Sequence, residues 1–281
     1  MSVALALRDA AVRLSATSDT ARLDAEVLMA HALGVSRSNV LVRQMDRPAP
    51  PEFAALVKRR EAHEPVAYIV GEQEFYGRSF RVSPDTLIPR SDSESVITAA
   101  LEALAPQEGG QILDLGTGTG ALLLSVLAER SDLRGLGVDR SRAALRVAKQ
   151  NAQRHDLAER AQFREKAWCA GPDASWHPWT HGMETYDLIL ANPPYVETTA
   201  ALDASVRDFE PHEALFAGPE GLDDYRIIIP SLRHLMREGA KAILEIGASQ
   251  AQAVSEIAQN AGFSAEIRYD LANRPRVVIL W

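Results

Sequence analysis

The chain has 281 residues, 46% of them hydrophobic, which is enough to fold one large domain or two smaller ones around a core. Its 30 basic and 38 acidic residues give a formal net charge of −8, which argues against a protein that follows long stretches of nucleic-acid backbone. A single cysteine, and no apolar run near the roughly 20 residues of a membrane helix, predict a cytoplasmic protein without a disulfide, a membrane segment or a metal site.

Helical spacing of apolar residues dominates the N-terminal part, where we expect a small helical bundle over residues 1–70. The predicted helices cover residues 3–14, 18–34, 36–44 and 50–62. The last of them ends in the basic run 58–60, which favourable placement near a helix C-terminus explains as well as partner binding does. Between residues 72 and 82 the apolar pattern alternates around Tyr76 and Gly77, which predicts a β-hairpin within a linker over 71–88.

Strands alternate with helices in the remaining domain, predicted over residues 89–281. The predicted strands cover 111–115, 133–139, 161–165, 186–191, 240–246, 264–270 and 276–281, and the helices between them 92–104, 120–130, 141–155, 222–237 and 250–261. This order is typical of an α/β fold with a doubly wound sheet, and the short connection between the last two strands predicts an antiparallel hairpin at one edge. The irregular stretch 168–185 is predicted to be a surface loop anchored by Trp176 and Trp179.

A glycine-rich loop follows the first long strand of this domain. Gly116, Gly118 and Gly120 lie between an apolar strand and a helix, where backbone without Cβ atoms can approach a ligand. Asp139 ends the next strand, where a carboxylate can accept hydrogen bonds from ribose hydroxyls. The pattern predicts a nucleoside-containing cofactor and leaves a nicotinamide dinucleotide open. Asp114, just before the loop, disfavours a pyrophosphate and favours a cationic ligand such as S-adenosyl-L-methionine.

A second motif ends the strand 186–191, where the sequence continues as Asn192, Pro193, Pro194 and Tyr195. The carboxyl end of this strand is expected at the same crevice as the glycine loop. An asparagine oxygen and a backbone carbonyl can each accept one N–H bond, and so hold an NH₂ group with its lone pair facing a methyl donor. The prolines add no competing donor, and the Tyr195 ring can pack against a planar group.

The sequence resembles the class I S-adenosylmethionine-dependent methyltransferases, with a Rossmann-like doubly wound sheet, and its Asn-Pro-Pro-Tyr motif resembles those that methylate amide or amino nitrogens. More narrowly it is similar to the release factor glutamine methyltransferases (the PrmC/HemK family), which modify the glutamine of the Gly-Gly-Gln motif in peptide-chain release factors. Beyond the two motifs the likeness extends over residues 22–28, 59–82, 87–94, 210–226, 244–250 and 270–278.

The resemblance implies transfer of a methyl group from S-adenosyl-L-methionine to the glutamine N5 atom, leaving S-adenosyl-L-homocysteine, with the N-terminal domain recognising the release factor. It implies cofactor binding by Asp114, Gly116, Thr117, Gly118, Thr119, Gly120, Asp139, Trp168 and Asn192. Catalysis would fall to Asn192, Pro193 and Tyr195, and the glutamine pocket to Asn192, Pro193, Pro194 and Tyr195. Trp168 would lie beside adenine. Two departures stand out: Ala167 replaces the usual acidic residue, and Ser91 and Ser93 replace the usual proline and threonine.

Other functions compete with this interpretation. A ribosomal-protein glutamine methyltransferase would share the motifs, and so would a DNA amino-methyltransferase, although the acidic balance argues against DNA binding. A non-catalytic cofactor-binding adaptor would have eroded motifs, which is not the case here. Cys169, His177 and His181 lack a fourth ligand for a metal, and the acidic segment 210–213 is interpreted as a wall of the active site. We expect a monomer.

Overall fold

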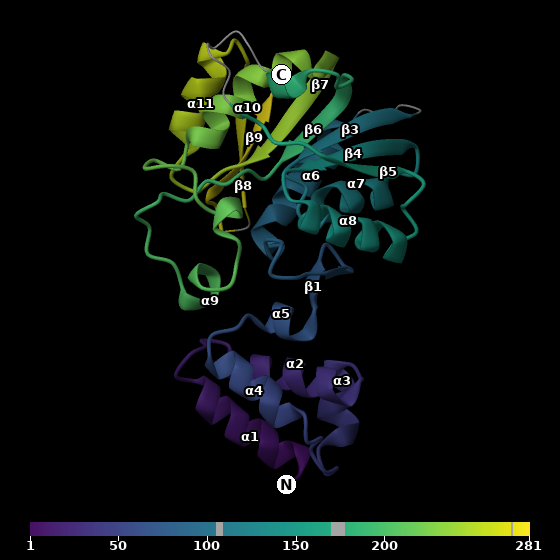
Figure 1. Cartoon of the computed structure of the whole chain (residues 1–281), viewed down its shortest axis with the longest axis vertical. Coiled ribbons are helices and arrows are strands. Elements are labelled where there is room, and N and C mark those ends of the chain that lie inside the picture. Colours follow the sequence, from purple (N-terminus) through teal and green to yellow (C-terminus); the bar gives the residue numbers. More distant parts are fainter. Residues whose placement is uncertain (105–108, 170–177, 271) are drawn as a thin grey trace. The chain divides into compact units, whose positions relative to one another are not determined.

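The computed structural model describes residues 1–104, 109–169, 178–270 and 272–281. Trp176, the predicted loop anchor, and His177, a candidate metal ligand, lie outside the described residues. The chain divides into two compact units, each drawn in Figure 1. The helical unit comprises Met1–Glu72 and Leu202–Glu210, and the sheet unit comprises Gln73–Ala201 and Pro211–Trp281. Within the described ranges, no helix is both long and apolar enough to cross a bilayer.

The helical unit packs its helices around an apolar core that includes Leu7, Leu28 and Val57. Its helices are α1 (Val3–Leu14), α2 (Ala21–Leu33), α3 (Arg37–Asn39), α4 (Phe53–Glu61), α5 (Val66–Val70) and α9 (Ala204–Arg207). The predicted helix over 36–44 is instead the short α3 followed by a π-helical turn over Val40–Gln44. Gly34 ends α2 in the left-handed conformation, with φ of 63°, as a C-terminal glycine does.

Two of the three cations in the basic run 58–60 form ion pairs within the helical unit. Arg60 lies 2.7 Å from Asp24, and Arg59 pairs with Glu64, so these two cations are neutralised within the unit.

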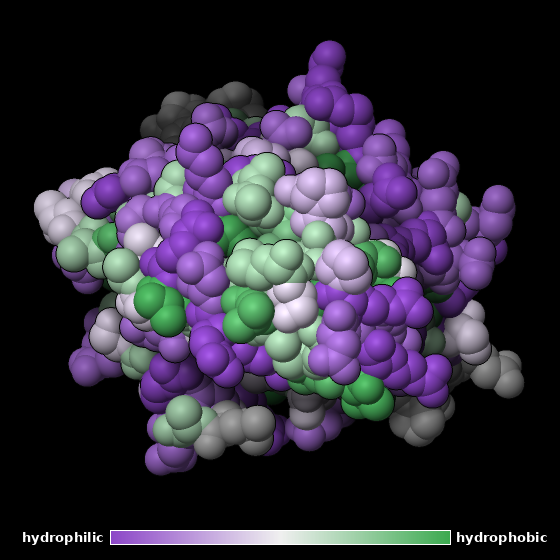
Figure 2. Space-filling view, turned by 90° about the horizontal axis from the view of Figure 1, so that it is seen from below, coloured by the Kyte–Doolittle hydropathy of each residue, from purple (hydrophilic) through white to green (hydrophobic). Residues whose placement is uncertain are grey.

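Figure 2 shows apolar side chains gathered among hydrophilic ones on the face seen from below. The exposed large apolar residues of this unit are Met1, Leu5, Val12, Leu23, Leu41 and Val42.

Over its described residues, the sheet unit is built on seven strands in the order β5-β4-β3-β6-β7-β9-β8. Their bounds are β3 (Gly110–Leu115), β4 (Leu133–Asp139), β5 (Ala161–Glu165), β6 (Tyr186–Ala191), β7 (Met236–Glu245), β8 (Ala265–Tyr269) and β9 (Pro275–Leu280). The first five are parallel, and β9 runs antiparallel to both β7 and β8. The predicted α/β fold class and edge hairpin are therefore confirmed, with β9 inserted between β7 and the edge strand β8.

A separate two-stranded hairpin consists of β1 (Glu72–Phe75) and β2 (Arg78–Arg81). Its turn is formed by Tyr76 and Gly77, which have φ of 50° and 70°. Two successive positive φ values match the right-handed twist of the flanking strands, which is why a Tyr-Gly pair serves here. The predicted hairpin and its turn are confirmed.

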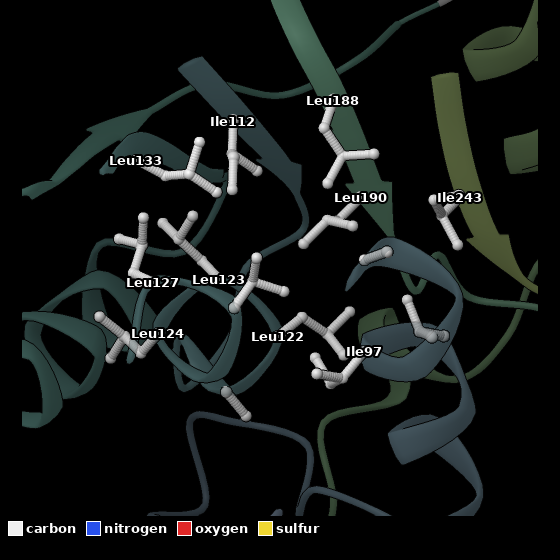
Figure 3. Close-up of a cluster of buried hydrophobic side chains, with 14 of the residues drawn as sticks. Ile97, Ile112, Leu122, Leu123, Leu124, Leu127, Leu133, Leu188, Leu190 and Ile243 are labelled. Atoms are coloured by element: carbon white, nitrogen blue, oxygen red, sulfur yellow. The ribbon is translucent and has the colours of Figure 1, made fainter. Parts of the chain in front are cut away.

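Helices cover both faces of the large sheet, because alternate strand residues point to opposite sides. One face holds α6 (Glu94–Ala103), α7 (Ala121–Glu129) and α8 (Arg142–Arg154), and the other α10 (Asp223–Ser231) and α11 (Ala251–Asn260). In Figure 3 leucines and isoleucines of the strands point toward those of α6 and α7. Burial of such side chains contributes on the order of 25 cal/mol per Å² of apolar surface and fixes the sheet against its helices.

The predicted helix over 222–237 is wrong at its C-terminal end. α10 ends at Ser231, a 3₁₀ turn covers Leu232–His234, and β7 already begins at Met236. Pro230 lies in the last turn of α10, where it lacks the N–H that would bond the preceding turn. The strand is accordingly longer than predicted, and it pairs with β6 from its first residue.

Candidate active site

A cavity of about 280 Å³ lies within the sheet unit at the carboxyl ends of β3, β4 and β6. This is the switch point of the sheet, because β4 lies on one side of β3 and β6 on the other. Several predicted residues line it: Gly116, Thr117, Gly118, Thr119, Asp139, Trp168, Asn192 and Pro194. Phe75, Ser93 and Arg140 also line it, and sequence reasoning gave them no role. Pro211, Glu213 and Ala214 form part of the wall.

The glycine loop is held open by backbone geometry that only glycine adopts easily. Gly116, Gly118 and Gly120 have φ of 71°, 53° and 81°. A Cβ atom on Gly116 would lie 3.0 Å from the Trp168 ring atom Cη2, so the loop and the indole face each other closely. Asn151, fully buried on α8, donates to the Thr119 carbonyl oxygen at 2.9 Å and fixes the far side of the loop.

Asp139 joins the glycine loop to the start of α8. Its Oδ2 accepts from the Gly118 N–H at 2.9 Å, and its Oδ1 accepts from the Ser141 N–H at 2.8 Å. Burial raises the pKa of Asp139, while those two backbone donors act in the opposite direction. Each carboxylate oxygen can accept more than one hydrogen bond, so acceptor capacity remains toward the cavity.

Asp114 lies behind the loop and does not line the cavity. It is 1% exposed, its Oδ2 accepts from the Thr117 hydroxyl at 2.6 Å, and its Oδ1 has no hydrogen-bond partner. Burial raises the pKa of Asp114 to about 7. Asp114 therefore contacts Thr117 and not the cavity. It could attract a cationic ligand there only electrostatically, without direct contact.

The raised pKa of Asp114 predicts a pH-dependent stability that Asp114→Asn removes. Between about pH 5 and about pH 7 the folded protein keeps a proton that the unfolded chain has lost, so the free energy of unfolding falls as pH rises. The variant should therefore gain about 2 kcal/mol over the parent across this interval. Urea unfolding at several pH values measures the difference, with the exposed Glu266→Gln as control. A difference that does not change with pH would contradict the prediction.

Trp168 is fixed by a partner far along the chain. Its Nε1 donates to the carboxylate of Asp224 on α10, and burial raises the pKa of Asp224 whereas this bond lowers it. The indole is thus held at both ends, by Asp224 and by the close approach of Gly116. No local sequence pattern connects Asp224 with Trp168, because the two residues are 56 positions apart.

Asn192 lies in the cavity wall and has a hydrogen-bond partner that was not anticipated. Its Nδ2 donates to the Ser93 hydroxyl at 3.3 Å. In the sequence, Ser93 stands out only as a departure from the family pattern. Pro194 lines the cavity together with Asn192, whereas the neighbouring Pro193 is buried and does not.

Tyr195 and Gly120 also lie outside the cavity lining. The Tyr195 hydroxyl donates to Glu245 Oε1 at 3.1 Å, and burial raises the pKa of this tyrosine. Its carbonyl accepts from Gln250 at 3.0 Å, and a Cβ on Gly221 would come within 2.2 Å of that oxygen. The ring is thus fixed beneath the motif, where it supports the wall.

Of the candidate metal ligands, Cys169 and His181 lie within the described residues, and His177 does not. Cys169 is exposed, and within the described ranges no group of three or more His, Cys, Asp or Glu side chains could hold a metal ion.

Comparison with known proteins relates this geometry to a family. Residues 6–71 match the domain family described as PrmC N-terminal domain, and residues 106–216 match a methyltransferase domain family. The chain is 41% identical to the release factor glutamine methyltransferase of Cereibacter sphaeroides over 99% of this chain and 98% of that protein. It is 38% identical to that of Moorella thermoacetica over 100% and 99%. The chain belongs to the release factor glutamine methyltransferase family.

As a member of the release factor glutamine methyltransferase family, the chain is an S-adenosylmethionine-dependent methyltransferase. Its fold agrees with that of a methyltransferase from Pyrococcus furiosus, at 13% identity and a TM-score of 0.51 over 81% of this chain and 96% of that one. The resemblance stated from the sequence is therefore confirmed, as are the fold class and the type of enzyme.

Proposed function

We propose that this enzyme transfers a methyl group from S-adenosyl-L-methionine to the N5 atom of the glutamine in the Gly-Gly-Gln motif of peptide-chain release factors. The observation that carries the proposal is the position of Asn192. Asn192 lines the same cavity as Gly116 and Asp139, in a chain that aligns almost end to end with release factor glutamine methyltransferases.

The residues present fit the proposed cofactor. Gly116 leaves a cradle beside Trp168 that any Cβ would fill, and Asp139 keeps acceptor capacity for ribose hydroxyls. Trp168, held by Asp224, offers a flat apolar surface for adenine. When bound, the cofactor supplies an electrophilic methyl group on a positively charged sulfur.

Asn192 acts on the other reactant. Its Oδ1 accepts one N–H bond from the substrate amide, and Pro194 beside it offers no competing donor. An amide nitrogen needs alignment more than prior deprotonation, since it loses a proton readily once it carries positive charge. Alignment of reactants contributes roughly 7 to 11 kcal/mol to barrier lowering, so a dedicated general base is not required. Glu213 is accordingly a wall residue, exposed and paired with Arg140 at 3.2 Å.

The helical unit is proposed to contribute to release factor binding. Its exposed apolar residues include Leu5 and Val12, 53% and 70% exposed and seven positions apart on α1, hence on one helix face. Exposed apolar side chains ringed by polar ones are typical of protein contacts.

The proposal is tested with labelled S-adenosyl-L-methionine and purified release factor, with and without a substitution of the Gly-Gly-Gln glutamine. Label should enter the intact factor and be absent from the substituted one. Label that persists after the substitution would reject the proposed substrate. In a parallel reaction with purified ribosomal protein in place of the factor, label in that protein but not in the factor would also reject it. A short peptide with the same motif should show a far lower kcat/KM than the factor. Equal values would argue against a role of the helical unit in recognition.

A further inference from the structure

We propose that the β1–β2 hairpin sets the position of the glycine loop through Asn151, which is therefore a positioning residue of the cofactor site. Along the chain the hairpin follows directly after the helical unit, since β1 begins at Glu72, where the first segment of that unit ends. The inference rests on the proposed function, because it takes the cavity beside the glycine loop as the site of S-adenosyl-L-methionine.

Asn151 lies on α8 without exposed surface and makes hydrogen bonds in two directions. Toward the hairpin, its Oδ1 accepts from the Arg81 N–H at 2.7 Å and its Nδ2 donates to the Arg81 carbonyl oxygen at 3.1 Å. Toward the glycine loop, the same Nδ2 donates to the Thr119 carbonyl oxygen at 2.9 Å. One carboxamide thus connects the backbone of the last residue of β2 with the backbone of the loop.

The donors and acceptors of this carboxamide admit one orientation. Nδ2 carries two hydrogens, one for each carbonyl oxygen, and Oδ1 faces an N–H group. The flipped carboxamide would set Oδ1 against both carbonyl oxygens. The bond to Thr119 matters because the glycines on either side of it, Gly118 and Gly120, both have positive φ and leave the loop backbone easily deformed.

The hairpin is itself packed against α8 and reaches the cavity. Phe80 is fully buried, with its ring centroid 4.9 Å from that of His155 at the end of α8. It is 6.1 Å from the ring centroid of Phe75, which lines the cavity. A displacement of the hairpin can therefore act on the cavity directly through Phe75 or on the glycine loop through Asn151, and the variants below separate these two routes.

Asn151→Asp keeps the size of the side chain and an acceptor for Arg81, but it removes the donor to Thr119. The Kd for S-adenosyl-L-homocysteine and KM for S-adenosyl-L-methionine should rise on the order of 10- to 100-fold, because a buried carbonyl oxygen loses its partner and the loop shifts. At saturating cofactor, kcat and KM for release factor should change less than about 3-fold. A role confined to general stability would instead lower the unfolding midpoint and leave both cofactor constants of the folded protein unchanged.

Gly77→Val tests the hairpin with Asn151 intact, and so applies even where Asn151→Asp fails to fold. Gly77 is an exposed turn residue with φ of 70°, and its Cβ would meet no atom beyond its chain neighbours within 4 Å, so the change strains only the turn. The strained hairpin can relax in the free enzyme, and cofactor binding has to return it to its place. The Kd for S-adenosyl-L-homocysteine should therefore rise about 3- to 10-fold.

Gly239→Val is the matched control. Gly239 is exposed on β7, has φ of 78° and equally open surroundings, and does not line the cavity. Its Kd should stay within about 2-fold of the parent. When Asn151→Asp is already present, Gly77→Val should add less than about 2-fold, because the connection that carries its effect is gone.

Three calorimetric results would overturn the inference: parent affinity in a folded Asn151→Asp protein, equal affinities of Gly77→Val and Gly239→Val, or fully multiplicative effects in the double variant. The last would assign the action of the hairpin to Phe75. A parent enzyme that does not bind S-adenosyl-L-homocysteine would refute the proposed cofactor site instead. The ligand-free protein still decides the inference in that case, through the backbone amide NMR signals of Gly118 and Gly120. These should shift in Gly77→Val, stay in place in Gly239→Val, and no longer respond to Gly77→Val once Asn151→Asp is present.

Discussion

Asn192→Ala should lose methyl transfer by about 10²- to 10³-fold in kcat, the range seen when one preorganised hydrogen-bonding group is removed from an active site. Asn192 lines the cavity, and in the proposed function its side chain holds the substrate amide, so its removal costs alignment at the reacting nitrogen. The proposed cofactor site, lined by Gly116, Asp139 and Trp168, comes from the ends of β3 and β4 and the segment after β5, and truncation of Asn192 should leave it unchanged. Cofactor affinity should therefore remain largely intact.

The measurement is single-turnover methylation of release factor beside calorimetric titration with S-adenosyl-L-homocysteine. Tyr269→Ala, an exposed residue on the edge strand β8, serves as a matched control and should behave like the parent. Near-normal methylation by Asn192→Ala would contradict the assignment of this residue to catalysis. A large loss of cofactor affinity with normal saturated turnover would move its role to cofactor binding.

Asp139→Ala should weaken cofactor binding by at least about 10²-fold, because hydrogen bonds to a charged group contribute about 1.5 to 3 kcal/mol each. The variant loses the proposed acceptor for ribose hydroxyls and also the acceptor of the Gly118 and Ser141 N–H groups. The second loss loosens the glycine loop itself. The effect should appear in KM for the cofactor, and kcat at saturation should change far less.

Calorimetry with S-adenosyl-L-homocysteine and KM for S-adenosyl-L-methionine measure this effect. Glu266→Ala removes an exposed carboxylate of the same unit and should leave both values unchanged. Cofactor affinity within about 3-fold of the parent in Asp139→Ala would show that the carboxylate does not face the ribose.

The sequence predicted those parts of the site that follow from the order of elements. Gly116 follows β3, Asp139 ends β4 and Asn192 follows β6. These strands are parallel neighbours, so the meeting of the three residues at one edge follows from the connectivity of an α/β sheet. The hairpin turn at Tyr76 and Gly77 was predictable for a local reason, its need for positive φ.

The parts that were missed depend on contacts between distant residues. Ser93 meets Asn192 across 99 positions, and Asp224 meets Trp168 across 56, and neither pair has a local pattern. The Tyr195 side chain is directed by its hydrogen bond to the buried Glu245, a residue that the sequence predicted only as part of a strand. The wrongly predicted end of α10, in contrast, had a local signal in the sequence. Pro230 lacks a backbone N–H, which indicates that the helix ends close to it.

The discontinuous make-up of the helical unit changes how the enzyme can be taken apart. Leu202–Glu210 belongs to that unit although it sits within the chain of the sheet unit, so the two are joined by three peptide connections instead of one. A cut only between Glu72 and Gln73 places Met1–Glu72 and Leu202–Glu210, the two parts of one compact unit, on different fragments. A fragment that stops at Glu72 lacks part of its own contacts, whereas a circularly permuted chain could retain them all.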